Sequence, residues 1–201
     1  GNELVPMDNV QLPVGNFRYS AARVDLLSAT EYTLVPLVFD ESGSTTRFAK
    51  LIEKGASEIL KSLRRSPRAD NLMIRSTAFG SQVREIEGFK PLMAYDPDKC
   101  DGWYQPGGMT ALYDATFEAL QATKDYAQTL YSRDYKINMI GFVITDGDES
   151  GDSLMNVDAV RQELESMVEK EFIESALMVL IGVNVKDPHM SKRLKEYEQQ
   201  A

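Results

Sequence analysis

The chain has 201 residues, of which 43% are hydrophobic, and this is enough for one compact domain with a sizeable core. Its 31 acidic side chains outnumber its 22 basic ones, which gives a formal net charge of -9. This charge argues against nucleic acid as a partner, because phosphate binding needs a concentrated basic face, and it favours cations as ligands.

The first elements lead to a buried strand. Residues 1–16 mix prolines, glycines and polar residues, which predicts an extended or flexible lead-in to a single domain over 17–201. Residues 17–27 alternate weakly between apolar and polar, as is typical of an edge strand. Residues 32–39 form an unbroken apolar run, which predicts a central parallel strand covered on both faces.

An amphipathic helix is expected after this strand, because apolar residues recur at helical spacing for about four to five turns. The apolar positions are Phe48, Leu51, Ile52, Ile59, Leu60 and Leu63. Residues 71–79 are rich in apolar and β-branched residues and predict the next strand. Residues 82–86 follow a Gly-Ser turn, which predicts a short antiparallel edge strand.

The second half of the chain continues the alternation of helix and strand. Residues 87–109 are rich in glycine and proline and form a connection of roughly twenty residues, too long for an idle loop in a compact domain. Apolar spacing then predicts a long buried helix over 112–130 and a further helix over 157–168. Continuous apolar runs at 137–145 and 176–183 predict two more buried strands.

This order of elements predicts an α/β fold. We expect a doubly wound, mostly parallel central sheet with one short antiparallel edge strand and helices on both faces. Asp187 and Pro188 predict the start of one final helix.

Oxygen-bearing side chains gather at the expected carboxyl ends of two strands and at the start of a helix. Asp40, Ser42 and Ser44 follow the first buried strand, Thr110 precedes the long helix, and Asp146 follows the strand over 137–145. These five donors are all hard oxygens, without His or Cys, so Mg²⁺ is the expected ion and Mn²⁺ is possible. An octahedral ion has six positions, so one is left for a carboxylate from another protein.

Three separate motifs together resemble the metal-ion-dependent adhesion site of von Willebrand factor A domains. They are Asp40-Glu41-Ser42-Gly43-Ser44, Gly108-Met109-Thr110 and Thr145-Asp146-Gly147. The resemblance implies a Rossmann-like fold in which the strands ending at Asp40 and Asp146 are neighbours where the strand order reverses. It also implies that Ser42, Ser44 and Thr110 bind the ion directly, with Asp40 and Asp146 bound directly or through water.

The function implied by the resemblance is metal-dependent protein–protein interaction, in which Mg²⁺ captures an Asp or Glu of a partner; service as an adaptor in a larger complex is one form that this function can take. One departure is the end of the chain, where a single helix follows the strand over 176–183 and the family usually adds another strand and helix. Either residues 17–27 fill that edge of the sheet or the chain is shortened there.

Two other functions fit the same residues. Asp40 at a strand end suits the nucleophile of a Mg²⁺-dependent phosphohydrolase, but such enzymes place a second acid two residues later, where this chain has Ser42. The metal site can also be purely structural. Serine-nucleophile hydrolysis is disfavoured because the single histidine, His189, lies in the expected final helix and no nucleophile elbow occurs. We therefore expect a binding module and no enzyme.

A partner-binding rim can be suggested beside the metal. Trp103 and Tyr104 come shortly before Thr110, and Asp148 follows Asp146. Aromatic rim residues often contribute strongly to interfaces. The alternative is that the aromatic side chains pack the long connection onto the sheet and that Asp148 belongs to a solvated acidic surface.

The expected location is the cytoplasm. A single cysteine, Cys100, cannot form an internal disulfide, which fits a reducing compartment. No apolar run approaches the length of a transmembrane helix, and residues 1–15 lack the basic cluster and apolar stretch of a signal peptide, so we expect no membrane insertion.

Overall fold

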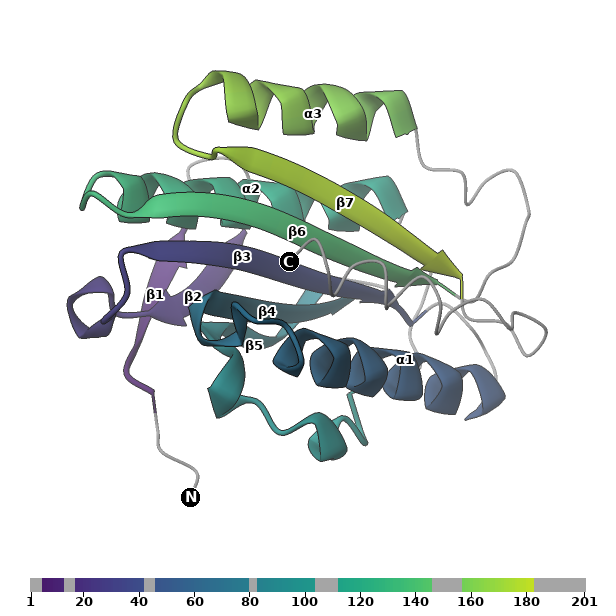
Figure 1. Ribbon diagram of the computed structural model, residues 1–201. Coiled ribbons are helices and arrows are strands. Elements are labelled where there is room, and N and C mark those ends of the chain that lie inside the picture. The colour runs from purple at the N-terminus through teal and green to yellow at the C-terminus, as the bar shows by residue number, and fades with distance from the viewer. Residues whose placement is uncertain are drawn as a thin grey trace.

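The computed structural model describes residues 5–12, 17–41, 46–79, 83–103, 112–145 and 157–182 (Figure 1). Seven strands of this part form one mixed sheet in the order β1-β2-β5-β4-β3-β6-β7. The strands are β1 (Met7–Gln11), β2 (Arg18–Ala22), β3 (Glu31–Asp40), β4 (Leu72–Phe79), β5 (Val83–Pro91), β6 (Lys136–Thr145) and β7 (Ser175–Gly182). The helices are α1 (Thr46–Arg64), α2 (Leu112–Tyr131) and α3 (Val157–Glu169), with short 3-10 turns η1 (Val24–Leu26), η2 (Ala69–Asn71), η3 (Leu92–Ala94) and η4 (Pro97–Lys99).

The expected α/β fold is confirmed. Strands β4, β3, β6 and β7 are paired in parallel, while β5 is antiparallel to β4 and β1 is antiparallel to β2. The antiparallel strand expected at 82–86 is present as β5, but it is longer and lies inside the sheet. Strand β5 lies inside the sheet because β4 pairs with one of its sides and β2 with the other, with Ala21 of β2 opposite Phe89 of β5.

The amino-terminal part of the chain extends the sheet. Residues 7–11, expected as an extended or flexible lead-in, form β1 and pair with β2 through the register from Met7 opposite Ala22 to Gln11 opposite Arg18. Strand β2 is therefore second from the edge. It lies at the β5 end of the sheet and not beside β7, so residues 17–27 do not fill the edge next to β7.

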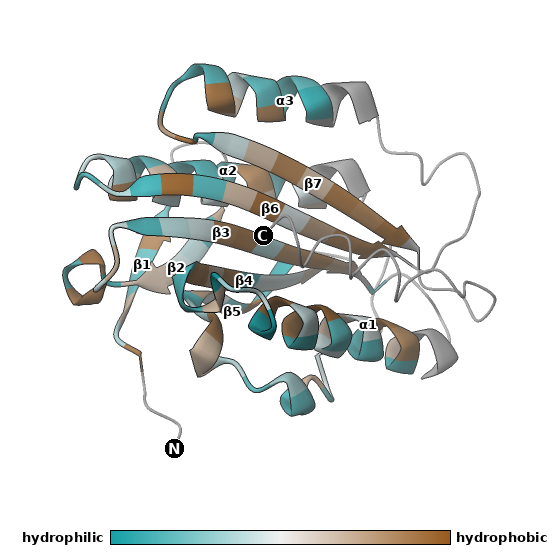
Figure 2. Ribbon diagram, viewed as in Figure 1, coloured by the Kyte–Doolittle hydropathy of each residue, from teal (hydrophilic) through white to brown (hydrophobic). Residues whose placement is uncertain are grey.

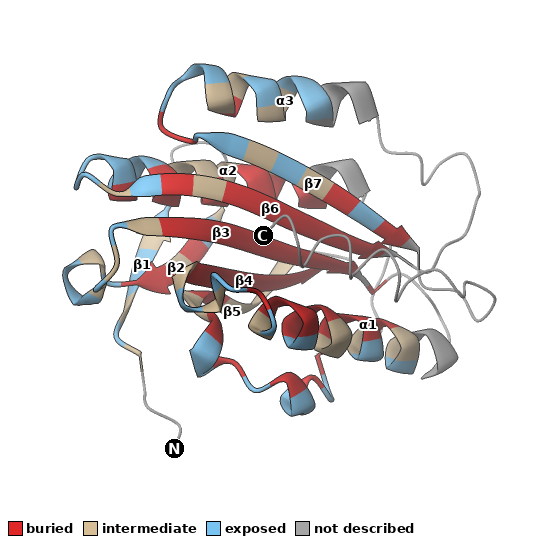
Figure 3. Ribbon diagram, viewed as in Figure 1, coloured by how far each residue is buried: buried red, intermediate tan, exposed pale blue. Residues whose placement is uncertain are grey.

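Helices cover both faces of the sheet, as expected. Helix α1 packs on one face, whereas α2 and α3 pack on the other (Figure 1). In β3 the buried side chains alternate: Val35, Leu37 and Phe39 belong to the core cluster of α1, and Leu34 belongs to the cluster of α2. Because both faces of β3 are covered, its sequence is continuously apolar, and Figures 2 and 3 show this strand as hydrophobic and buried through its middle.

The β1–β2 hairpin is held on α2 by two tyrosine hydroxyls. Tyr126 donates a hydrogen bond to the Ala22 carbonyl at 2.7 Å, and Tyr19 donates one to Asp125 Oδ2 at 2.5 Å. Burial, reinforced by Asp125, raises the pKa of Tyr19 well above its ordinary value, so its hydroxyl keeps the proton that it donates.

None of the described helices is both long and apolar enough to cross a membrane.

A charged network lies inside this arrangement, between β4, α2, β5 and β2. The Arg75 side chain is 1% exposed and donates to both carboxylate oxygens of Glu118 at 3.1 and 2.8 Å. Its Nε donates to Glu85 at 2.7 Å, and Glu85 in turn accepts hydrogen bonds from the backbone N–H and hydroxyl of Ser20. We call these four residues the Arg75 network.

Arg75 stays charged in the core because two carboxylates face it. Burial by itself would lower the pKa of Arg75, but the hydrogen bonds and charges of Glu118 and Glu85 outweigh burial and raise it. Strand β2 also approaches β5 very closely at this point, since a Cβ on Gly88 would collide with the Ser20 backbone carbonyl and hydroxyl. Glycine at 88 therefore allows the hairpin to reach the network.

We expect Arg75→Met to lower the free energy of unfolding by about 3–5 kcal/mol, because it leaves the buried Glu118 carboxylate without its cation. The double variant Arg75→Met/Glu118→Leu should recover much of this loss, since the two most deeply buried charges are then replaced by apolar groups, while Glu85 is 21% exposed and keeps its hydrogen bonds from Ser20. Urea unfolding followed by circular dichroism measures both. A double variant no more stable than the single one would show that packing, and not the unpaired charge, causes the loss.

Candidate functional site

The candidate site lies at the carboxyl ends of β3 and β6. These strands are parallel neighbours, with Phe39 opposite Ile144, and they end at Asp40 and Thr145. From β3 the chain crosses to β4 on one side, while β6 lies on the other side, so the strand order reverses between them. This is the point at which open α/β sheets bind ligands, and it is the arrangement that the resemblance to von Willebrand factor A domains implies.

The remaining predicted ligand, Thr110, precedes in the sequence a helix that packs on these two strands. Helix α2 packs against β3 and β6 and begins at Leu112, two residues after Thr110. Ser42, Ser44, Thr110 and Asp146 lie outside the described residues, and Asp40 is described only in its backbone. The rim candidates Tyr104 and Asp148 are outside as well. Their roles therefore stay predictions.

The donor set fits a hard divalent cation. The five predicted ligands supply carboxylate and hydroxyl oxygens, which suit Mg²⁺ or Mn²⁺ and not Zn²⁺. Within the described ranges no three His, Cys, Asp or Glu side chains come together in a way that could hold a metal. The predicted ligands belong to the segments that follow β3 and β6 and precede α2 in the sequence.

Glu41, the acidic residue inside the first motif, is already paired. It is 4% exposed, and its carboxylate accepts a hydrogen bond from Arg84 Nη2. Its backbone N–H donates to the Phe79 carbonyl at 2.7 Å, which extends the contact between β3 and β4 one residue beyond Asp40. Glu41 is thus directed to a structural ion pair, in agreement with its absence from the predicted ligands.

Trp103 is packed in the core. Its ring stacks on Phe39, with centroids 6.2 Å apart and planes 3° from parallel, and Tyr95 meets it edge-on at 6.3 Å. The residue is 8% exposed, so little of its ring is available to a partner. This position agrees with the alternative given from the sequence, in which the Trp103 side chain packs the long connection onto the sheet.

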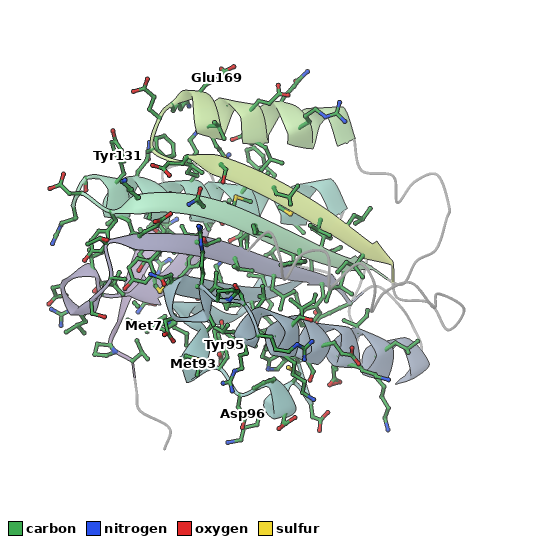
Figure 4. The ribbon with its side chains drawn as sticks, in the orientation of Figure 1. Met7, Met93, Tyr95, Asp96, Tyr131 and Glu169 are labelled. Atoms are coloured by element: carbon green, nitrogen blue, oxygen red, sulfur yellow. The ribbon has the colours of Figure 1, made fainter. Side chains whose placement is uncertain are left out.

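The connection from β5 to Trp103 is held against α1. The Gly102 N–H donates to Glu53 of α1 at 2.9 Å, and Arg64 of α1 donates to the Tyr95 carbonyl. Gly102 has a φ of +82°, which glycine adopts without strain. Figure 4 shows Tyr95 and Asp96 on this connection, beside α1. The first part of the long loop expected from the sequence is therefore a packed segment.

Arg84 is the residue near the site that sequence reasoning missed. Its Nη2 donates to the Trp103 carbonyl at 2.5 Å as well as to Glu41. The only signal in the sequence was an acidic residue, Glu41, close behind a buried strand and before the first helix, which suggests that a cation is needed nearby. Nothing in the sequence pattern indicated which cation that is.

Comparison with known proteins gives likeness in fold only. No protein-family model matches the chain, and no curated protein matches it. A mutant of the PilB minor pilin from Streptococcus sanguinis has a TM-score of 0.50 and 11% identity over 92% of this chain. At this identity the similarity concerns the fold alone, and it agrees with the α/β architecture.

Other solved structures are similar at lower scores. The manganese-loaded TRAP protein of Plasmodium vivax has a TM-score of 0.47 and 17% identity over 85% of this chain. The vWF domain of the type V pili tip protein Mfa5 from Porphyromonas gingivalis has a TM-score of 0.38 and 15% identity, covering 60% of this chain and 39% of that one. This chain spans 64% of the PilB chain and 63% of the TRAP chain, less than two thirds of either.

The packing of the connection can be tested at Cys100, which is buried within it. Burial, assisted by the nearby carboxylates of Glu53 and Asp101, raises the pKa of this thiol to about 12. The thiolate is the reactive form, so at pH 8 we expect labelling by a thiol reagent to be at least about a hundredfold slower than in urea. Trp103→Ala should speed native labelling; equal rates with and without Trp103 would contradict the packed connection.

Proposed function

We propose that this chain is a protein-interaction module in which a divalent cation captures an Asp or Glu side chain of a partner. The ion is Mg²⁺, with Mn²⁺ as a substitute, and its ligands are Asp40, Ser42, Ser44, Thr110 and Asp146. The observation that carries the proposal is the pairing of β3 with β6, which end at Asp40 and directly before Asp146 where the strand order reverses.

The chemistry of the segments supports binding by an outside carboxylate. Five oxygen donors leave one position of an octahedral ion open. Only two of the five are carboxylates, and Glu41, the nearest additional acid in the described part of the first segment, is committed to Arg84. An ion bound in this way keeps excess positive charge, which attracts a further acidic group.

Metal binding is the first test. Isothermal titration with Mg²⁺ and Mn²⁺ should show one site in the unaltered chain, and Thr110→Ala and Asp146→Ala should each weaken it at least about tenfold, because each loses an oxygen ligand. Thr129→Ala is the matched control, since this exposed hydroxyl on α2 donates to the Asp125 carbonyl of its own helix. Unchanged binding in both ligand variants would contradict the proposed site.

Partner capture is the second part of the same test. The immobilised chain should retain a partner from native lysate in Mg²⁺ and lose it with a chelator or in Thr110→Ala, whereas Thr129→Ala should retain it. Retention under all conditions would contradict capture through the ion. If chelation lowers only the melting temperature and leaves capture unchanged, the metal is structural, because an ion that binds the folded state stabilises it without contacting the partner.

A Mg²⁺-dependent phosphohydrolase is the second candidate, and the observation that favours it is the position of Asp40 at the end of β3, where an aspartyl nucleophile can be exposed. Ser42 stands where such an enzyme needs its second acid. We expect phosphate release from small phosphoesters to stay at background, with Asp40→Ala identical to the unaltered chain. Turnover that disappears in Asp40→Ala would replace the binding function with a catalytic one.

A further inference from the structure

Arg84 joins the two segments that lead to the predicted ligands. It lies at the start of β5, and a single nitrogen, Nη2, donates both to the Glu41 carboxylate and to the Trp103 carbonyl. Glu41 immediately precedes Ser42, and Trp103 precedes Thr110 by seven positions. We propose that Arg84 is a positioning residue that holds these two segments at a fixed separation and thereby sets the affinity of the site for its cation.

The Glu41 side of this bridge is held firmly. The carboxylate is almost fully buried, so its bond to Arg84 is a charge-assisted hydrogen bond shielded from water. The backbone N–H of the same residue is bound to the Phe79 carbonyl of β4. Main chain and side chain of Glu41 are thus both held in place, directly before the predicted ligand Ser42 in the sequence.

The Trp103 side is equally constrained. Its ring lies between Phe39, the residue before Asp40, and Tyr95, whose hydroxyl donates to the Ile74 carbonyl of β4 at 2.9 Å. Its carbonyl accepts a hydrogen bond from Arg84, so main chain and ring are both held at this last described residue of the connection. Both segments are thus fixed relative to the ends of β3 and β4.

Arginine is suited to this position by its shape. The guanidinium is planar, always charged and carries several N–H donors in fixed directions, so one group can serve a carboxylate and a carbonyl together. The Arg84 side chain is 33% exposed, which spares part of the guanidinium the cost of complete desolvation. Lysine would keep the charge but not the fixed directions of the two hydrogen bonds.

Removing Arg84 should affect the ion although Arg84 does not bind it. The buried Glu41 carboxylate would lose its cation and the Trp103 carbonyl its donor, and both segments would relax. A metal site depends on ligands that are already in place, and loss of the groups that orient ligands typically lowers metal affinity by 10–100-fold. This inference rests on the proposed metal site.

The test compares Mn²⁺ binding in four proteins by isothermal titration. Arg84→Met should weaken binding about tenfold or more, and Arg84→Lys should restore part of the affinity. Lys90→Met is the matched control on the same strand, because Lys90 pairs with Glu87 and lies over the Tyr95 ring, whereas Arg84 is the donor to Glu41 and to the Trp103 carbonyl. Amide exchange without metal should be faster at Glu41 and Trp103 in Arg84→Met and unchanged in Lys90→Met.

The outcomes separate the two proposals. If the unaltered chain binds no Mn²⁺, the metal site and the role of Arg84 are both overturned. If it binds Mn²⁺ and Arg84→Met binds equally well, only the role of Arg84 is overturned, and equal weakening in Arg84→Met and Lys90→Met has the same meaning. Should Arg84→Met fail to fold, Glu41→Met removes the acceptor of Arg84 and keeps an unbranched side chain of similar length, and unaltered affinity in this variant would overturn the role of Arg84.

Discussion

The parallel pairing of β3 with β6 is the interaction on which the rest of this structure depends. Both strands are buried by helices on two faces, and their register brings Phe39 and Ile144 side by side just before each strand ends. The crossover connections after β3 and β6 lead to opposite sides of this pair, and both connections start from the carboxyl ends of the two strands. Helix α2, which begins just after Thr110, packs on the same two strands.

Two arginines on adjacent strands connect this core to the segments around it. Arg75 of β4 reaches α2 through Glu118 and the β1–β2 hairpin through Glu85 and Ser20, while Arg84 of β5 reaches Glu41 and Trp103. A charge can be buried only when it is paired and hydrogen-bonded, so each arginine specifies which segments must meet around it. The first fixes the helix and hairpin, and the second fixes the approach to the proposed metal ligands.

Aromatic packing adds to the second of these connections. Trp103 lies against Phe39 and Tyr95, so the long connection after β5 is tied to the end of β3 before it continues toward Thr110. The same packing removes the Trp103 ring from the surface and fixes the position of this last described residue of the connection. Rigid support beneath ligand-bearing segments is a general requirement of metal sites, and under the proposed function an aromatic stack and a bridging guanidinium would supply it.

Local patterns in the sequence were sufficient for α1, α2 and α3 and for the buried strands β3, β4, β6 and β7, because apolar periodicity depends only on neighbouring residues. The grouping of oxygen donors in three motifs, and the helix expected from Asp187, lie outside the described residues and stay predictions. The place of β5 inside the sheet, the addition of β1 and β2, and the burial of Trp103 were decided by tertiary structure. So were the partners of the arginines, since Arg75 and Glu118, like Glu41 and Arg84, are 43 positions apart. Such pairs form only after register and crossovers are set, and periodicity within one segment carries no information about them.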